Sequence, residues 1–155
     1  MKLRRLSRLH KQPTQLYFAY GANMSLNSML GRCPSAQPVE RWYLKDWQLE
    51  FASHATVTPK TGSVVAGALW RITADCERRL DRFEGFPDYY TKTHVEQHGR
   101  RFMLYVMCPP LAGQPSASYV SCLRDGYNDW QLDHDLLDQA LGNSHDIDYY
   151  DLRSL

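Results

Sequence analysis

One carboxyl group of this sequence stands where it could transfer protons. Glu84 ends a helix that is predicted from residue 74, with Thr73 as its N-cap and Gly85 just past its end. One face of this helix carries residues spaced i, i+4, i+7 and i+8, which are Cys76, Leu80, Phe83 and Glu84. Glu84 therefore lies on an apolar stripe, where burial and the helix C-terminus both raise the pKa of a carboxyl, as suits a general base. The alternative is a structural role, in which Glu84 caps a neighbouring group or pairs with an arginine of the same helix: Arg78, Arg79 or Arg82.

The second candidate site is the turn Tyr20-Gly21-Ala22-Asn23-Met24. It follows a predicted strand and precedes a predicted helix start, where backbone N–H groups without intrahelical partners can converge on an anion. Gly21 lets a ligand approach the backbone closely. The alternative is an ordinary strand-to-helix turn with Asn23 or Ser25 as the cap. The turn lacks the G-x-G-x-x-G and P-loop lysine patterns, so nucleotide binding has no specific support.

The cysteines and histidines predict neither a metal site nor a cofactor. No C-x-x-C pair occurs among the cysteines, which are Cys33, Cys76, Cys108 and Cys122. Reduced thiols in a cytosolic protein fit this spacing best. His94 and His98 have the spacing of helical zinc ligands, but their segment is predicted to be a strand, along which four residues span about 13 Å. We therefore expect no metal and no cofactor.

These groups must be positioned by strands in the first two thirds of the chain and by helices that come mainly in the last third. Apolar and β-branched runs predict strands over residues 16–20, 39–51, 56–58, 63–72, 89–97 and 101–108, with a hairpin turn at 59–62. Helices are predicted over residues 25–31, 74–84 and 132–141 and from residue 116. This order indicates an α+β domain with a mixed or antiparallel sheet, not the regular alternation of a Rossmann fold.

Length and charge divide the chain into one domain and two flanking segments. Its 155 residues suffice for one core. We predict a basic, flexible arm at residues 1–14, a domain at 15–145 and a polar, acidic tail at 146–155. The arm carries five basic side chains and no acid. A basic arm can bind nucleic acid or a membrane surface, but a solvated, mobile terminus is the simpler interpretation, and we assign the arm no function.

No stretch of the sequence predicts export or membrane insertion. A secretory signal needs about 7–15 consecutive apolar residues, whereas Leu3, Leu6 and Leu9 are separated by Arg and Ser. Charged residues interrupt every later run before it reaches the roughly 20 apolar residues of a membrane-spanning helix. We expect a soluble, cytoplasmic protein. We infer no oligomeric state from the sequence.

Five short segments, in order along the chain, together resemble the γ-glutamylcyclotransferase family, which includes the AIG2-like proteins. They are YFAYGANM at 17–24, RCP at 32–34, ATV at 55–57, GALW at 67–70 and LDRFEG at 80–85. The resemblance continues through Tyr90, residues 115–119 and residues 126–127, and it covers roughly residues 16–142. It implies a compact, mixed, barrel-like sheet with flanking helices. It also implies a cavity that joins the turn after the first strand to the glutamate of the L-D-x-[YF]-E-G segment.

The same resemblance implies an activity and the residues that perform it. A γ-glutamyl substrate would release 5-oxoproline and an amine when its α-amine attacks its own γ-carbonyl, with Glu84 as the general acid/base. Tyr119 would close the cavity from the C-terminal side. The γ-glutamyl group would lie against the backbone of the turn formed by Tyr20, Gly21, Ala22, Asn23 and Met24. The implied partner is a small γ-glutamyl substrate, without metal or cofactor.

One departure from the family and two alternative functions accompany this resemblance. The family's turn usually reads Y-G-S-N, and Ala22 stands where the serine is expected. A related enzyme that acts on γ-glutamylamines or γ-glutamyl antibiotics would share the same glutamate. A non-catalytic ligand-binding member, with its arm on nucleic acid or a partner protein, is the other alternative. Glu84 argues against it, because a buried carboxyl is costly to keep without a use.

Overall fold

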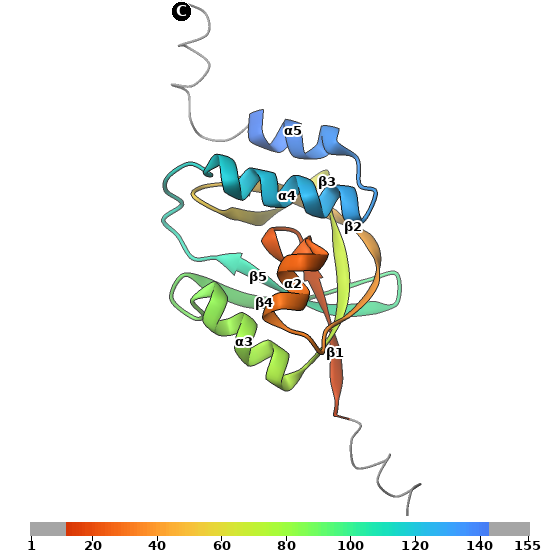
Figure 1. Ribbon diagram of the computed structural model, residues 1–155. Coiled ribbons are helices and arrows are strands. Elements are labelled where there is room, and N and C mark those ends of the chain that lie inside the picture. The colour runs from red at the N-terminus through yellow and green to blue at the C-terminus, as the bar shows by residue number, and fades with distance from the viewer. Residues whose placement is uncertain (1–11, 143–155) are drawn as a thin grey trace, which may run out of the picture.

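The computed structural model of this protein describes residues 12–142 and shows an α+β fold (Figure 1). Residues 1–11 of the predicted arm and the predicted tail at 146–155 lie outside the described residues. The strands are β1 (Thr14–Ala19), β2 (Gln37–Phe51), β3 (Ala55–Thr73), β4 (Tyr90–Gln97) and β5 (Arg100–Met107). The helices are the 3₁₀ turn η1 (Ala22–Met24), α2 (Leu26–Arg32), α3 (Ala74–Glu84), α4 (Ala117–Asp129) and α5 (His134–Gly142).

The strands form one mixed sheet in the order β2-β3-β1-β5-β4. β1 pairs in parallel with β5, and the other neighbours pair antiparallel. The predicted mixed sheet with flanking helices is therefore confirmed. Figure 1 shows α2 between α3 and α4. Because β1 is the central strand, the turn that follows it begins in the middle of the sheet and enters this group of helices.

The predicted hairpin at residues 56–72 is wrong, because this segment belongs to one long strand, β3, that runs along β2. Residues 60–63, which include most of the expected turn, form a bulge opposite a single residue of β2, Asp46. The Asp46 carboxylate accepts the N–H of Gly62 at 2.9 Å, and both residues have positive φ. The turn-forming residues are absorbed into the strand because β2 supplies a partner on both sides of them.

The sheet is not closed into a barrel, but a side chain links its two edge strands. Gln97 of β4 accepts the N–H of Lys45 on β2 at 3.2 Å and donates to the carbonyl of Lys45 at 2.8 Å. Nearby, Arg100 Nη2 at the start of β5 lies 3.2 Å from Glu40 Oε1 on β2. The predicted barrel-like shape is thus an open sheet whose edges meet through side chains.

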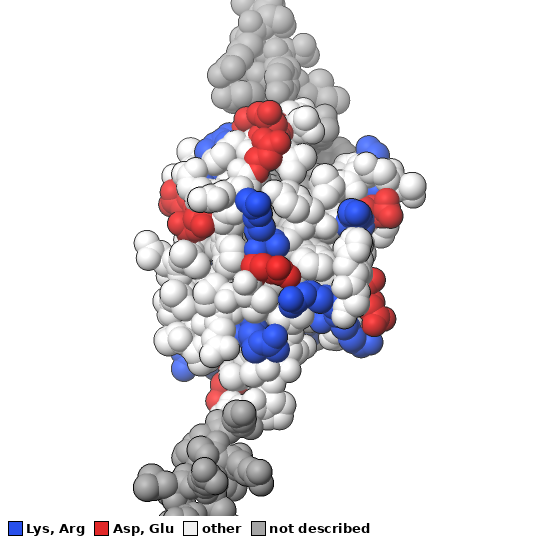
Figure 2. Space-filling model, turned by 90° about the vertical axis from the view of Figure 1, so that its right-hand side faces the viewer, with Lys and Arg blue, Asp and Glu red and all other residues white. Residues whose placement is uncertain are grey.

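Charged side chains of both signs are mixed on the face of the molecule seen in Figure 2. Lysine and arginine side chains lie there beside aspartate and glutamate side chains. Such mixing is typical of a solvated surface, whereas polyanion binding favours a continuous basic stripe.

Two glycines allow close packing around the end of β1. A Cβ atom on Gly67 of β3 would lie 2.5 Å from the carbonyl oxygen of Ala19. A Cβ atom on Gly126 of α4 would lie 2.7 Å from the Cβ atom of Met24. Both distances are shorter than any ordinary contact, so these positions require glycine. Gly126 in particular lets α4 lie directly against η1.

Helix α3 has the bounds that its local signals predict. The Thr73 hydroxyl accepts the N–H of Cys76 at 3.2 Å, and Gly85 ends the helix with a φ of 65°. Cys76 and Leu80 are buried, as the predicted apolar face requires. Phe83 is an exception, because 48% of this residue is exposed. The buried face of α3 therefore does not extend to Phe83.

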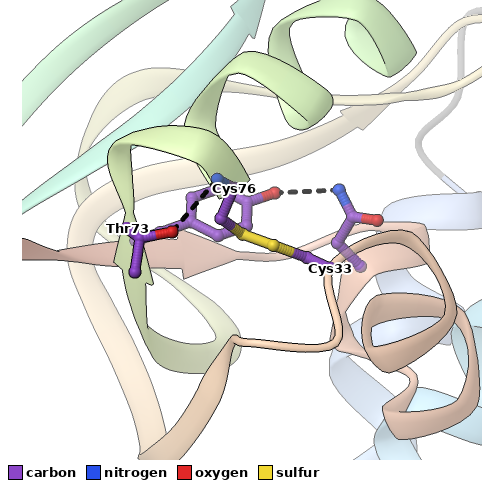
Figure 3. Close-up of a disulfide and its surroundings, with 5 residues drawn as sticks. Cys33, Thr73 and Cys76 are labelled. Atoms are coloured by element: carbon purple, nitrogen blue, oxygen red, sulfur yellow. Dashed lines mark hydrogen bonds between the residues drawn. A yellow bond between two sulfur atoms is a disulfide. The ribbon is translucent and has the colours of Figure 1, made fainter. Parts of the chain in front are cut away.

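Cys33 and Cys76 form a disulfide in this structure (Figure 3). The prediction of four reduced thiols is therefore wrong for this pair, while Cys108 and Cys122 are free. Cys33 follows the last residue of α2, and Cys76 lies in the first turn of α3, so the bond joins these two helices. The pairing was not visible in the sequence, because the two cysteines meet only when α2 packs beside α3. The cytoplasmic location stays a prediction.

Candidate functional site

A cavity of about 160 Å³ lies between the turn after β1, the end of α3 and the start of α4. Its wall is mainly aromatic and contains a single carboxyl group, that of Glu84. The lining residues are Tyr17, Tyr20, Gly21, Ala22, Asn23, His54, Ala55, Phe83, Glu84, Tyr89, Tyr90, Tyr105 and Tyr119. The two sites that the sequence singled out separately therefore share one cavity.

Glu84, the last residue of α3, has a carboxyl suited to proton exchange near neutral pH. Burial raises the pKa of this carboxyl to about 7, and the Arg32 guanidinium opposes the rise. The direction of the shift agrees with the prediction from the sequence. In the described part of the chain, no arginine of α3 forms an ion pair with Glu84. A carboxyl with a pKa near 7 can accept a proton and return it at the same pH.

Asn23 connects Glu84 to two other polar groups. Its Nδ2 atom donates to Glu84 Oε1 at 3.2 Å and to the hydroxyl oxygen of Tyr17 at 3.1 Å. Its Oδ1 atom accepts from Arg32 Nη1 at 2.6 Å. The Arg32 guanidinium carbon in turn lies 3.5 Å from the centre of the Phe83 ring. Because Asn23 is only 2% exposed, this network holds the Glu84 carboxyl on one side of the cavity.

Some backbone N–H groups of the turn after β1 bond within the turn, and others do not. The N–H of Met24 donates to the Gly21 carbonyl at 3.1 Å, and that of Ser25 to the Ala22 carbonyl at 3.3 Å. Among residues 12–142, the backbone N–H groups of Ala22 and Asn23 have no such acceptor. Met24 is fully buried and does not line the cavity, unlike the other four residues that were predicted for the turn. Its bond to Gly21 also means that its N–H is not available to a ligand.

Tyr119 of α4 lines the cavity together with Glu84 and lies against the turn. Its hydroxyl oxygen accepts the N–H of Ala55 at 3.0 Å, which leaves its own O–H free to donate. Burial raises its pKa, so the hydroxyl stays protonated. A Cβ atom on Gly21 would lie 3.1 Å from this hydroxyl. The absence of a side chain at Gly21 thus lets Tyr119 lie close to the turn, as well as letting a ligand approach it.

Sequence reasoning missed several residues of this site. Arg32 enters the sequence analysis only as part of the short RCP segment, yet it touches both Asn23 and Phe83. His54 lies in the connection between β2 and β3, where its Nδ1 atom is 2.8 Å from the hydroxyl of Tyr89. Tyr105 comes from a strand and donates to Asp81 Oδ1 at 2.6 Å. No local spacing connects these residues to Glu84.

Residues 12–142 carry neither a metal-binding cluster nor a membrane-spanning helix. No group of three or more His, Cys, Asp and Glu side chains in this range could hold a metal ion. Within the same residues, no helix is both long and apolar enough to cross a membrane.

Comparison with known proteins points to one family. Residues 17–131 match the family described as Gamma-glutamyl cyclotransferase, AIG2-like. No curated protein matches the chain. Among solved structures, the uncharacterized human protein loc79017 is 25% identical, with a TM-score of 0.73 over 88% of this chain and 90% of that chain.

Two other solved structures share the fold. A gamma-glutamyl cyclotransferase is 24% identical, with a TM-score of 0.75 over 88% of this chain and 91% of that chain. YkqA from Bacillus subtilis is 20% identical, with a TM-score of 0.68 over 92% of this chain and 58% of that chain. At these identities the likeness concerns the fold, so the chemistry has to be argued from the cavity itself.

Proposed function

Because the chain belongs to the Gamma-glutamyl cyclotransferase, AIG2-like family, we propose that it is an enzyme that converts a γ-glutamyl substrate to 5-oxoproline and an amine. The observation that carries this proposal is the Glu84 carboxyl, which lines the cavity with a pKa raised by burial to about 7. The reaction needs a base for one step and an acid for the next. A group whose pKa lies near the working pH serves both.

The first step is the closure of a five-membered ring. Glu84 as carboxylate accepts a proton from the α-ammonium group of the substrate. The neutral α-amine then attacks the γ-carbonyl carbon, a new C–N bond forms, and the carbonyl electron pair moves onto its oxygen. Since attack is intramolecular, holding the chain curled supplies much of the rate, up to about 7–11 kcal/mol in favourable cases. In this proposal the cavity of about 160 Å³ holds the γ-glutamyl chain in its curled conformer.

The second step breaks the original amide. We assign three donors to the oxyanion, all from residues that line the cavity: the N–H groups of Ala22 and Asn23 and the O–H of Tyr119. Loss of one such donor typically costs about 100- to 1000-fold in rate. Attack leaves the ring nitrogen with two protons and a positive charge. When the carbonyl re-forms, the bond to the departing nitrogen breaks, and the protonated Glu84 gives its proton to that nitrogen. The regenerated carboxylate then takes the surplus proton from the ring nitrogen and passes it to the departing amine, which leaves in its ammonium form. The products are 5-oxoproline and a free amine.

Ala22 is compatible with this scheme. The family usually has serine at this position, and the donor that the scheme uses is the backbone N–H, which alanine retains. The Ala22 carbonyl is meanwhile occupied, since it accepts from the N–H of Ser25 and from the thiol of Cys122 at 3.8 Å. The proposal therefore needs no side-chain oxygen at residue 22.

The test is 5-oxoproline release from a panel of γ-glutamyl donors, by wild-type protein and by Glu84→Gln. Glutamine keeps the shape and an acceptor for Asn23 but cannot exchange the proton. We expect turnover to fall by at least about 100-fold while substrate still binds, in line with losses of general acid/base groups. The control is Glu96→Gln, which alters an exposed glutamate of β4 outside the cavity. Wild-type turnover in Glu84→Gln would rule out the proposed role.

A further inference from the structure

The cavity holds little more than the γ-glutamyl part of a substrate. Its volume of about 160 Å³ is well below the roughly 300–1,000 Å³ of pockets that enclose a drug-sized ligand. A leaving amine of any size must therefore extend to the mouth of the cavity. The residues exposed there decide which amine is favoured.

The mouth is rimmed by exposed aromatic side chains. Phe83 is 48% exposed and Tyr89 is 42% exposed, and both line the cavity together with the exposed His54. Seven large hydrophobic residues of the described part of the chain are at least 36% exposed, and three of them, Phe83, Phe86 and Tyr89, lie within seven residues that begin just before Glu84. Exposed apolar side chains that gather at one place mark a contact surface for a ligand. We call Phe83, Tyr89 and His54 the aromatic rim.

The aromatic rim is held in place by contacts with its neighbours. The His54 ring packs edge-on against Tyr119 at 5.0 Å and against Tyr89 at 5.8 Å between ring centres. The Tyr89 ring packs edge-on against Tyr90 at 5.1 Å. The guanidinium of Arg32 lies 3.5 Å from the centre of the Phe83 ring. Rings that are already positioned lose little freedom when a ligand binds.

The charge of the site favours a leaving amine without a carboxylate. None of the described residues that line the cavity is a lysine or an arginine, and Glu84 contributes a negative charge when ionised. A leaving amino acid would bring a carboxylate to this mouth, where the nearby guanidinium of Arg32 is not among the lining residues and is already bonded to Asn23 and stacked on Phe83. An uncharged aromatic group meets neither repulsion nor an unpaired charge.

We propose that the aromatic rim selects γ-glutamyl derivatives whose leaving amine carries an aromatic ring and no carboxylate. This inference rests on the proposed function and adds the class of amine that leaves. Contacts between aromatic rings add binding free energy beyond that of the buried area. This additional free energy distinguishes an aromatic amine from an aliphatic amine of the same size.

The test compares three donors in 5-oxoproline release: γ-glutamylbenzylamide, γ-glutamylcyclohexylmethylamide and γ-glutamylglycine. We expect kcat/KM for the benzylamide to exceed that of the cyclohexyl donor by about 2- to 10-fold, the range that an aromatic pair contributes. The glycine donor should be the poorest of the three. Tyr89→Leu should remove most of the aromatic preference, and Tyr89→Phe, which keeps the ring, should retain it.

The matched control is Tyr43→Leu, which removes a tyrosine of β2 that is 38% exposed and outside the cavity. It should leave the ratio between the benzyl and cyclohexyl donors unchanged. Binding of each donor to Glu84→Gln supplies a second readout that needs no turnover. If none of the donors releases 5-oxoproline, the proposed function fails, and benzyl-selective binding still supports the rim. Equal binding of the benzyl and cyclohexyl donors, or a benzyl preference that survives in Tyr89→Leu, would overturn the inference.

Discussion

Asn23 of η1 and Glu84 at the end of α3 meet at 3.2 Å, where the side-chain amide of Asn23 donates to the carboxyl of Glu84. Arg32 reaches the same amide at 2.6 Å and lowers the pKa of Glu84, which burial raises. The pKa of the Glu84 carboxyl is therefore set by two opposing effects. Burial raises it, and the Arg32 guanidinium, which is bonded to Asn23, lowers it. Four predictions follow from this balance and from the contacts around it.

The pH dependence of turnover should report the pKa of Glu84. Since the first step needs the carboxylate, kcat/KM should rise with pH and level off above about 7. Arg32→Met removes the cation that lowers this pKa, so the rise should move to higher pH. The control is Arg82→Met. Arg82 lies in α3, the helix of Glu84, and does not shift the pKa of Glu84. An unchanged profile in Arg32→Met would contradict the electrostatic role of Arg32.

Folding stability should decrease as Glu84 ionises. The folded pKa, about 7, lies above the ordinary value of 4.5, so the folded state resists ionisation and its stability falls as pH rises between these values. The full effect is about 3 kcal/mol above pH 7 and vanishes below pH 4.5. Glu84→Gln should therefore be more stable than wild type at pH 8 and equally stable at pH 4. Urea denaturation at both pH values measures the difference, and a constant difference would exclude the raised pKa.

Gly21 and Tyr119 should be energetically coupled. Gly21→Ala places a Cβ atom 3.1 Å from the Tyr119 hydroxyl, which must then shift from the N–H of Ala55. Tyr119→Phe removes that hydroxyl and leaves the N–H of Ala55 without its acceptor, at a cost of about 1–3 kcal/mol. The second change should cost less in the Gly21→Ala background, because the bond is already weakened there. Unfolding free energies of both single variants and the double variant give the coupling. Additivity within about 0.5 kcal/mol would count against the contact.

The disulfide should be measurable in two independent ways. Denatured protein that was never exposed to reductant should show two reactive thiols, from Cys108 and Cys122, and four after reduction. Reduction should also lower the free energy of unfolding by about 2–4 kcal/mol, because the bond closes a loop across a sequence separation of 43 residues. Cys33→Ala with Cys76→Ala should reproduce this loss and become insensitive to reductant. Four reactive thiols without reduction would contradict the pairing.

Much of the fold could be predicted because its signals are local. Thr73 and Gly85 delimit α3 by capping bonds within a few residues, so the sequence alone was sufficient to place its ends. β3 shows where local signals mislead. The turn-forming residues at 60–63 became a bulge, since a partner strand and the Asp46 carboxylate supply what a hairpin turn would otherwise provide. Local preference is overruled when a neighbouring strand satisfies the backbone.

The sequence by itself determined that one glutamate ends an amphipathic helix and that a glycine-containing turn follows the first strand, because spacing and capping are properties of neighbouring residues. Only the tertiary structure decided what surrounds Glu84. Asn23 and Tyr119 line the cavity from different elements, Arg32 bonds to Asn23 from a third, and Met24 does not line it. The pairing of Cys33 with Cys76 has the same origin. Burial, a cation from another helix and a disulfide between distant cysteines depend on how helices pack, and the spacing of residues within any one segment does not record that packing.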